Sequence, residues 1–306
     1  MKHQYLINTP LDTAVLEYIK EIQNTGTTHG TETISVCESC GRVTANAVYA
    51  KICSPHYTAC AMDGIALKSS LTFGAAQTSP VQLSSCDYTE VDTGDPLPYG
   101  ADCVVMVEDL VESSGKILLH DSAVPWQNVR QIGEDICAGD MILPSYSEIT
   151  PAAVGAMLAG GVLNILAVKR PVVGIIPTGD EIIPPCDNPK DGDIIEFNSS
   201  IFKGILETWG ASALVYPIVK DDRDLIVSAL KSAVSECDAV ILNAGSSAGR
   251  EDFSAYAIEN IGKIIYHGIA IKPGKPAVLG ICGNVPVLGV PGYPVSGIIV
   301  LEHILK

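Results

Sequence analysis

Acidic residues follow apolar runs at several points in the second half of the chain, close to segments rich in glycine and serine. No histidine or cysteine stands among them, and carboxylates alone suit a hard cation such as Mg²⁺. Side chains that follow different parallel strands can meet at one edge of a sheet. The pattern predicts a divalent-metal site whose candidate ligands are Asp180, Glu181, Asp221, Asp222 and Asp252, although the last three can also be helix caps.

A second group of residues suits an anion. The apolar run 239–242 is followed by Gly245, Ser247 and Gly249, and then by a helical pattern that starts after Asp252. Backbone amides and a helix dipole converge in such a strand, loop and helix arrangement, although a plain connection explains the same pattern. Paired cations stand nearby in Lys272-Pro-Gly-Lys275, and lysines with amides bind phosphate or another oxyanion. Together the two groups indicate a site for a phosphorylated ligand with a divalent metal.

Several other classes of protein are excluded. None of the six histidines stands in a Ser-His-Asp or Cys-His arrangement, and both the Walker A sequence and the strand-turn GxGxxG are absent. A net charge of −16 argues against nucleic-acid binding, because phosphate backbones need clustered lysine and arginine. No apolar run approaches about 18 residues and no signal peptide is found, so we expect a cytoplasmic protein without membrane contact.

The ten cysteines are scattered, and several stand inside apolar runs. In a cytoplasmic chain we expect them to be reduced and to serve as small buried residues. Cys37-Glu-Ser-Cys40 is a single CxxC without a second pair. A structural turn is favoured there over a zinc or redox site.

Short apolar runs alternate with helical patterns from residue 170 to residue 306. Strands are expected at 172–176, 213–218, 239–242, 278–281 and 285–290, and helices at 198–209, 223–236, 253–260 and from 295 to the last residue. This alternation predicts a three-layer α/β/α domain, in which ligands bind at the carboxyl ends of the strands.

The first half of the chain has a different texture. Residues 43–141 form short β-like runs broken by Gly, Pro, Asp and Ser, which indicates a mostly β domain. Thr9-Pro10 and Thr150-Pro151 each start a capped helix on either side of it. The predicted fold is therefore multidomain α/β, with the β domain inserted into a discontinuous helical linker domain of residues 1–42 and 142–169, and the α/β domain at 170–306.

Motifs in both halves match one family. The first half contains Met62-Asp63-Gly64, Thr93-Gly94 through Pro98-x-Gly100-Ala101-Asp102, and Arg130-x-x-Gly133-Glu134-Asp135. The second half contains Thr178-Gly179-Asp180-Glu181, Asn198, Gly245-x-Ser247-x-Gly249-x-x-Asp252, Lys272-Pro-Gly-Lys275-Pro276 and Pro291-Gly292-x-Pro294-Val295-Ser296. With these motifs, nearly the whole chain resembles the molybdopterin molybdotransferase family, which comprises the MoeA proteins and the gephyrin E-domain.

The resemblance implies an activity and a site. Family members insert molybdate into adenylylated molybdopterin with hydrolysis of the adenylate, and they act as homodimers whose site faces the β domain of the partner. By position, the catalytic residues would be Asp63, Asp180, Glu181 and Asp252, and Mg²⁺ would be the metal on the acidic residues named above. Residues that bind the pterin or the oxyanion would be Thr93, Thr178, Gly179, Gly245, Ser247, Gly249, Lys272, Lys275, Pro291, Pro294 and Ser296. Glu134 and Asp135 would join Asp63 and Thr93 in the contribution from the β domain.

The chain departs from the family pattern at four positions. Ala244 replaces a glycine, Ile65 an aromatic residue and Tyr293 an asparagine, and the serine before Met62 is shifted to Cys60-Ala61. No charged group is lost, so the departures bear on the substrate more than on the class of reaction. They leave open a homologue that is specific for tungstate. A non-catalytic molybdopterin-binding or scaffold module is the alternative, although it would not need the acidic residues. Nucleotide-processing enzymes that share only the α/β domain lack the Asp63 and Thr93 motifs. The family carries a further β-barrel domain after the α/β domain, and from this we expect the chain to be part of a longer protein.

Overall fold

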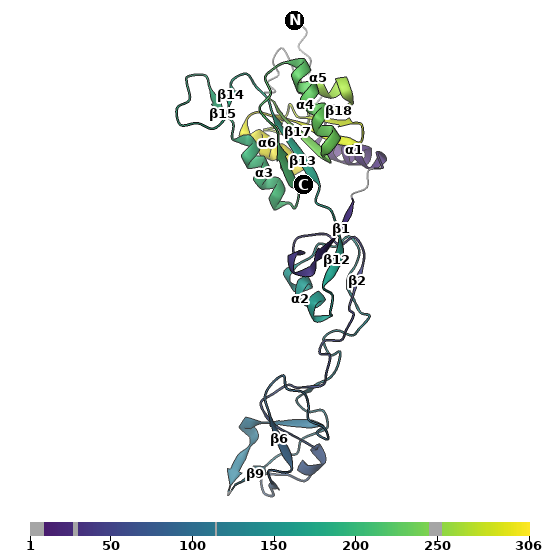
Figure 1. Ribbon diagram of the computed structural model, residues 1–306, viewed down its shortest axis with the longest axis vertical. Helices are drawn as coiled ribbons and strands as arrows, with labels where there is room; N and C mark the ends of the chain where they lie inside the picture. Colours follow the sequence, from purple (N-terminus) through teal and green to yellow (C-terminus); the bar gives the residue numbers. More distant parts are fainter. Residues whose placement is uncertain (1–8, 27–29, 114, 245–252) are drawn as a thin grey trace. The chain divides into compact units, whose positions relative to one another are not determined.

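The structure is a computed structural model of the chain, and it describes residues 9–26, 30–113, 115–244 and 253–306. The chain divides into two compact units, one formed by the residues up to Gly30 together with those from Lys169 onward, the other by Thr31–Val168. Figure 1 shows the elements of both units.

The first unit is built on a six-stranded sheet. Its strand order is β16-β13-β17-β20-β19-β18. The first four strands are parallel, and β19 is antiparallel to both of its neighbours. The strands are β13 (Val172–Pro177), β16 (Ser212–Val215), β17 (Ala239–Ala244), β18 (Lys263–His267), β19 (Val278–Cys282) and β20 (Val285–Pro291).

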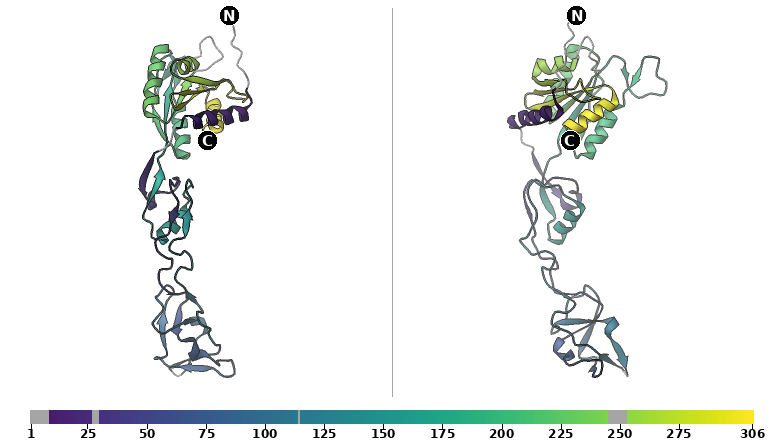
Figure 2. Two further views of the ribbon diagram at one scale, coloured as in Figure 1. Left: turned by 90° about the vertical axis from the view of Figure 1, so that its right-hand side faces the viewer. Right: turned by 180° about the vertical axis from the view of Figure 1, so that it is seen from behind.

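Helices cover both faces of this sheet, as Figures 1 and 2 show. One face packs against α1 (Leu11–Asn24), α3 (Asn198–Thr208) and α6 (Pro294–Ile304), and the other against α4 (Arg223–Glu236) and α5 (Phe253–Ile261). Side chains alternate between the faces along a strand, so Ile241 of β17 enters the first core while Val240 and Leu242 enter the second. The three-layer α/β/α domain predicted from the sequence is confirmed.

The first helix belongs to this unit, whereas the sequence grouped residues 1–42 with residues 142–169. Ala14 and Tyr18 of α1 are buried in the core of the α/β unit. The Tyr18 hydroxyl donates hydrogen bonds to the carbonyl oxygens of Gly280 (2.9 Å) and Val287 (3.2 Å). Burial of a large aromatic residue with a satisfied hydroxyl fixes the helix on the sheet.

Other elements of this unit also differ from what the sequence predicts, and the strand expected at 213–218 spans Ser212–Val215. The helix predicted to start at Pro10 with a Thr9 cap begins at Leu11, and its N-cap Pro10 makes no side-chain capping bond. The last helix, expected to continue to Lys306, ends at Ile304. Strand β18 was not predicted, because its five residues show only a short apolar run with polar residues at both ends.

Within the residues that the structure describes, the second unit contains one α-helix, α2 (Pro151–Ala159), and short strands. The Thr150 side chain caps α2 as predicted, accepting from the Ala153 amide at 3.2 Å. The strands of this unit form the pairs β1–β12 and β2–β11. Residues 59–130, between β2 and β11 in the chain, form the pair β3–β10 and the three-stranded sheets β6-β4-β7 and β5-β9-β8. These strands are β1 (Thr31–Ser35), β2 (Val48–Tyr49), β3 (Ala59–Cys60), β4 (Gly64–Leu67), β5 (Val81–Leu83), β6 (Tyr88–Val91), β7 (Cys103–Met106), β8 (Val111–Ser113), β9 (Lys116–Leu119), β10 (Val129–Arg130), β11 (Met141–Leu143) and β12 (Asn164–Val168).

Candidate functional site

Three parallel strands of the first unit end side by side. The Thr178 amide donates to the Asn243 carbonyl oxygen at 3.0 Å, and Asn243 is in turn paired with Val290. The next two strands after β13 in the six-stranded sheet lie on its opposite sides, β16 on one side and β17 on the other. The strand order therefore reverses between β13 and β17. Such a reversal in strand order marks the place where α/β sheets bind ligands.

A cavity of about 550 Å³ opens at this edge. Such a volume falls within the range of small-molecule sites. Four of the predicted site residues line it, namely Thr178, Glu181, Pro291 and Pro294. The remaining lining residues are Pro177, Ile182, Ile194, Ile195, Glu196, Phe197, Asn198, Asn243, Gly292 and Tyr293. Ile182 and Ile194 belong to a short parallel pair, β14 (Ile182–Ile183) and β15 (Ile194–Ile195).

Asn198 is a buried polar residue in the wall of this cavity. Its Nδ2 donates to the Gly292 carbonyl oxygen at 2.8 Å and lies 3.5 Å from the Oδ1 of Asn243. Because a backbone carbonyl only accepts, this contact fixes the orientation of the Asn198 amide. Within the described part of the chain, Asn198 Oδ1 and the Thr178 hydroxyl are buried without a hydrogen-bond partner. Such groups are costly to leave unpaired, so they offer acceptors to a bound molecule or water.

The acidic residues predicted to bind a metal divide into two groups. The Asp221 amide donates to Asp180 Oδ1 at 3.3 Å. Burial raises the pKa of the Asp221 carboxyl, and the charges of Asp180 and Glu181 raise it further. These three carboxylates are therefore neighbours, whereas the Asp222 side chain caps α4 by accepting from the Asp224 and Leu225 amides.

Gly179 allows the acidic turn to form. Its φ is +150°, and an added Cβ would lie 2.6 Å from Cγ1 of Ile182. The Lys220 ammonium donates a hydrogen bond to the Asp180 carbonyl oxygen at 2.6 Å. Any residue other than glycine would therefore displace the segment that carries Asp180 and Glu181.

Lys272 and Lys275 lie in the connection between β18 and β19, and both are exposed. Gly274 between them has a φ of +114°, and a Cβ there would lie 2.7 Å from Val300 of α6. The connection therefore packs closely against α6, whose first turn holds the buried Ser296. Neither lysine lines the cavity described above.

The remaining predicted residues of this edge lie outside the described residues. They are Gly245, Ser247, Gly249 and Asp252. Among the residues that the structure does describe, no three His, Cys, Asp or Glu side chains are grouped closely enough to hold a metal ion.

In the second unit, Asp63 and Thr93 contact each other as the motifs suggest. Asp63 Oδ1 accepts from the Thr93 amide at 2.6 Å and from the Thr93 hydroxyl at 2.8 Å. These two bonds lower the pKa of the exposed Asp63 carboxyl, because they favour its charged form. Asp63 is thus held ionised, on a turn that continues into β4.

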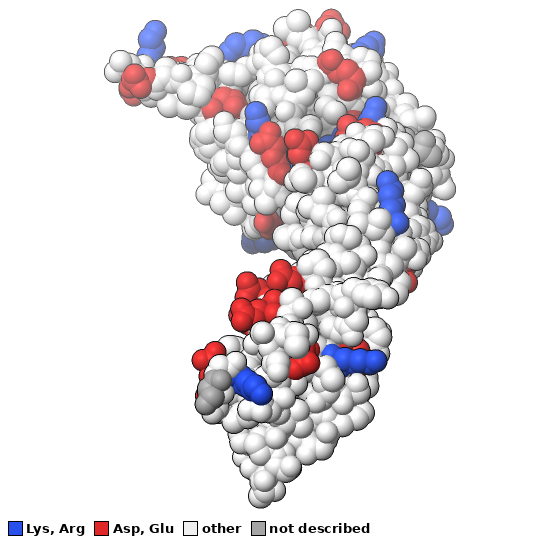
Figure 3. All heavy atoms as spheres, turned by 60° about the horizontal axis from the view of Figure 1, so that its bottom comes forward, with Lys and Arg blue, Asp and Glu red and all other residues white. Residues whose placement is uncertain are grey.

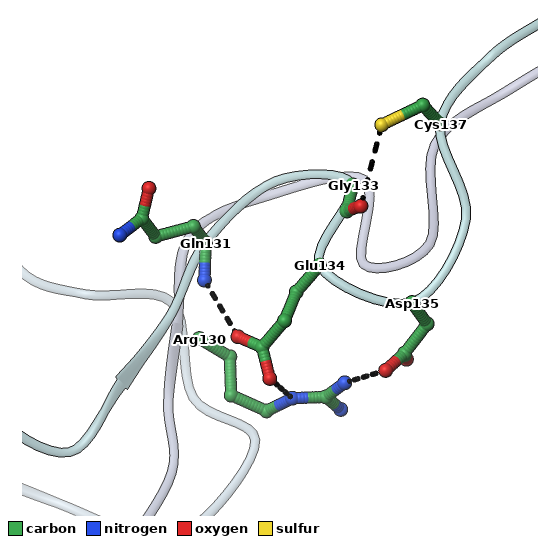
Figure 4. Close-up of polar contacts among 6 residues, drawn as sticks. All are labelled: Arg130, Gln131, Gly133, Glu134, Asp135 and Cys137. Carbon is green, nitrogen blue, oxygen red and sulfur yellow. Dashed lines mark hydrogen bonds and ion pairs between the residues drawn. The ribbon is translucent and has the colours of Figure 1, made fainter.

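Glu134 and Asp135 lie on either side of Arg130 (Figure 4). The Arg130 guanidinium is 2.5 Å from Asp135 through Nη2 and 3.4 Å from Glu134 through Nε. Glu134 also accepts from the Gln131 amide at 3.2 Å. All three charged side chains are partly exposed, so the cluster shapes this turn more than it stabilises the fold.

On the face drawn in Figure 3, acidic side chains gather in several groups while the basic ones are scattered. This distribution agrees with the net charge of −16 and offers no basic patch on that face for a nucleic acid. No helix in the described ranges is both long enough and apolar enough to cross a membrane.

Sequence reasoning missed several residues of the cavity wall. Asn243, Phe197 and Tyr293 were not proposed as site residues, and Asn198 was noted only as part of a motif. Asn243 is the one polar residue near the carboxyl end of β17, which ends at Ala244, and a polar residue at that position is the signal that could have placed it.

Two family models match the chain. The MoeA N-terminal region (domain I and II) matches residues 10–161, and the probable molybdopterin binding domain matches residues 174–306.

Relatives match over most of their length. A protein of Methanocaldococcus jannaschii named for molybdopterin biosynthesis is 34% identical, with 89% of this chain and 72% of the relative covered. The molybdopterin molybdenumtransferase of Haemophilus influenzae is 30% identical, with 90% and 71% covered. The crystal structure of the molybdopterin biosynthesis MoeA protein of Pyrococcus horikoshii OT3 is similar with a TM-score of 0.80 and 27% identity, covering 98% of this chain and 78% of that one.

Proposed function

The chain belongs to the molybdopterin molybdenumtransferase family, known as MoeA, and on that premise we propose that it inserts molybdate into adenylylated molybdopterin with Mg²⁺-dependent hydrolysis of the adenylate. The observation that supports the proposal best is the cavity at the carboxyl ends of the parallel strands, which is lined by Thr178, Glu181, Pro291 and Pro294 of the family motifs. Cleavage of a phosphoanhydride develops negative charge, and an acidic group beside a ligand cavity suits the cation that such a step requires.

Asp180, Glu181 and Asp221 supply donor atoms of the kind that Mg²⁺ binds, although within the described residues they are not grouped closely enough to hold the ion by themselves. All their donor atoms are oxygen, which this ion prefers. Burial, and after it the charges of Asp180 and Glu181, raises the pKa of the Asp221 carboxyl, and a divalent cation would offset the repulsion among the three carboxylates. When bound, the cation would neutralise the negative charge that develops as the phosphoanhydride is cleaved and AMP leaves. Asp222 is engaged as a helix cap, and we assign it no contact with the metal.

The cavity fits the flat pterin ring. Phe197 and Tyr293 both line it, and they remain 45% and 68% exposed, so their ring faces are free to contact a ligand. Pterins carry N–H donors at one edge, which match the unpaired Oδ1 of Asn198 and hydroxyl of Thr178. The ring would stack against the aromatic residues and direct its edge toward these acceptors.

The exposed lysines of the β18–β19 connection suit the anionic substrate groups. Molybdate is a tetrahedral dianion, and Lys272 and Lys275 supply positive charge without a competing carboxylate in their segment. Lysine acts on such anions as a point charge, so it accepts phosphate and molybdate alike. We extend the proposal to Gly245, Ser247, Gly249 and Asp252, which stay predictions from the family motif.

A homodimer is the second part of the proposal. Asp63 and Thr93 form an ordered, charged turn in the second unit. An aspartate held ionised suits contact with a cation or with a proton donor on the substrate. In the proposed assembly, the Asp63 turn of one subunit faces the Gly245 segment of its partner.

The test is release of AMP by the purified protein from adenylylated molybdopterin. We expect release only when molybdate and Mg²⁺ are both present, and Asp180→Asn to abolish it. Asp187→Asn is the matched control, since Asp187 is exposed and does not line the cavity. Equal release by parent and Asp180→Asn would remove the acidic group from the mechanism, and binding without release would indicate a scaffold.

A further inference from the structure

Two antiparallel segments of the second unit place Cys53 opposite Cys137. Strand β2 pairs with β11 so that Tyr49 faces Met141, and an isolated bridge farther along the same segments joins Ser54 to Ile136. Both pairs have the same register. Cys53 and Cys137 are the residues next to the Ser54–Ile136 bridge on the two segments, so they stand across from each other.

The type of pairing brings these cysteines close. Ser54 and Ile136 exchange both backbone bonds, with N–O distances of 2.8 and 3.0 Å, so they form a hydrogen-bonded pair. The neighbouring pair is then the non-hydrogen-bonded kind, in which the Cα atoms are about 4.5 Å apart. A disulfide needs Cα atoms between about 4.4 and 6.8 Å apart.

The sulfur atoms also lie on one side of the segments. A Cβ built on Gly133 would be 2.9 Å from the Cys137 sulfur and 3.6 Å from the Cys53 sulfur, so both lie close to one point. The Cys137 thiol donates to the Gly133 carbonyl oxygen (Figure 4), and the Ala138 amide donates to the Cys53 sulfur at 3.4 Å. Cys137 is exposed and Cys53 is half-buried, so a small reagent can reach the pair.

We propose that Cys53 and Cys137 form a redox-modification site that reacts with a low-molecular-weight disulfide such as glutathione disulfide. The exposed Cys137 thiolate attacks one sulfur of the reagent, and one reagent thiol leaves. The Cys53 thiolate then attacks the Cys137 sulfur and releases the second thiol. Two protein thiols are oxidised to one disulfide, and the reagent disulfide is reduced to two thiols.

The bond would act on a turn that carries family motif residues. Arg130, Glu134 and Asp135 form their ion pairs within the segment that ends at Cys137. A disulfide at Cys137 would fix the end of this segment against residue 53, and it would close a long loop that contains most of the β strands of the second unit. The contacts that support this cysteine pair do not depend on the proposed transferase reaction.

The experiment treats the reduced full chain with glutathione disulfide, traps free thiols by alkylation and maps the peptides by mass spectrometry. We expect loss of two of the ten thiols, with one peptide link between Cys53 and Cys137 that dithiothreitol reverses. Cys53→Ser and Cys137→Ser should each abolish the link. Cys37→Ser, at another exposed cysteine, should retain it.

Three results would overturn the proposal. They are an unchanged thiol count, a link between other cysteines, and a stable glutathione adduct on Cys137 without ring closure. Serine is nearly isosteric with cysteine, and a thermal melt of each variant beside the parent checks that it folds.

Discussion

Asp221 and Asp222 are adjacent, but their surroundings differ, so the same substitution should have different effects at the two positions. Asp222 accepts two hydrogen bonds at the start of α4, at 3.0 Å from Asp224 and 2.9 Å from Leu225. Asp221 is close to two other carboxylates. We predict that Asp221→Asn loses metal-dependent turnover without loss of stability, whereas Asp222→Asn keeps both.

The magnitudes follow from these contacts. Asp and Asn cap a helix almost equally well, whereas Asp222→Ala should lower the free energy of unfolding by about 1 kcal/mol. For a unit of this size, that change lowers the melting temperature by about 2–4 °C.

The expected change in the free energy of unfolding has the opposite sign for Asp221→Asn. Its pKa is raised in the folded state, so above that pKa the ionised carboxylate destabilises the fold relative to the unfolded chain. Asp221→Asn removes this repulsion, and the free energy of unfolding should rise by at most a few tenths of a kcal/mol, because the group is largely exposed and screened.

Thermal melts at neutral pH measure the stability effects, and AMP release over a wide range of Mg²⁺ concentrations measures turnover. The predicted pattern has only Asp222→Ala reduced in melting temperature and only Asp221→Asn reduced in turnover. Parental turnover of Asp221→Asn at every Mg²⁺ concentration would refute the assignment of Asp221 to the metal. A fall in turnover for Asp222→Asn would show that its role extends beyond the helix cap.

Three further predictions concern other parts of the molecule. Thr93→Val removes one of the two bonds that lower the pKa of Asp63, so a carbon-13 NMR titration should show that pKa rising toward the ordinary aspartate value. The ionised Asp63 stabilises the fold at a pH above the ordinary aspartate pKa, and in the variant this stabilisation should be lost at a higher pH as the solution is acidified. An unchanged pKa would contradict the contact. Tyr293→Ala should weaken molybdopterin binding about ten-fold in a fluorescence titration while Tyr293→Phe preserves it, and equal binding by all three proteins would remove the stacking role. Light scattering should give the mass of a dimer at micromolar concentration, and a monomer would argue against a site shared between subunits.

Regular elements with strong local signals could be predicted from the sequence. The helix Arg223–Glu236 was placed with its observed bounds, because a capping aspartate precedes an amphipathic pattern of 14 residues. The buried strands of the α/β unit were recognised for a similar reason, since continuous β-branched runs are characteristic of parallel sheets. Strand β18 escaped detection because it is short and lies at the edge of the sheet.

Contacts between distant residues could not be predicted in this way. The docking of α1 depends on bonds from Tyr18 to carbonyl groups more than 260 residues away. Similarly, the pairing of Asn198 with Gly292 and the register of Cys53 with Cys137 depend on how segments meet in space. Asp221 and Asp222 look alike in the sequence, and only their neighbours distinguish a cap from a member of the acidic group.

The central claim is transfer of molybdenum to the pterin, and the most direct measurement is the molybdenum content of the product. The protein would be incubated with adenylylated molybdopterin, molybdate and Mg²⁺, the pterin separated from the protein, and its molybdenum measured by mass spectrometry beside the AMP released. We expect equimolar molybdenum and AMP, and we expect both to be lost in Asp180→Asn. AMP released without molybdenum in the pterin would contradict it, because the protein would then be a hydrolase of the adenylate and not a transferase.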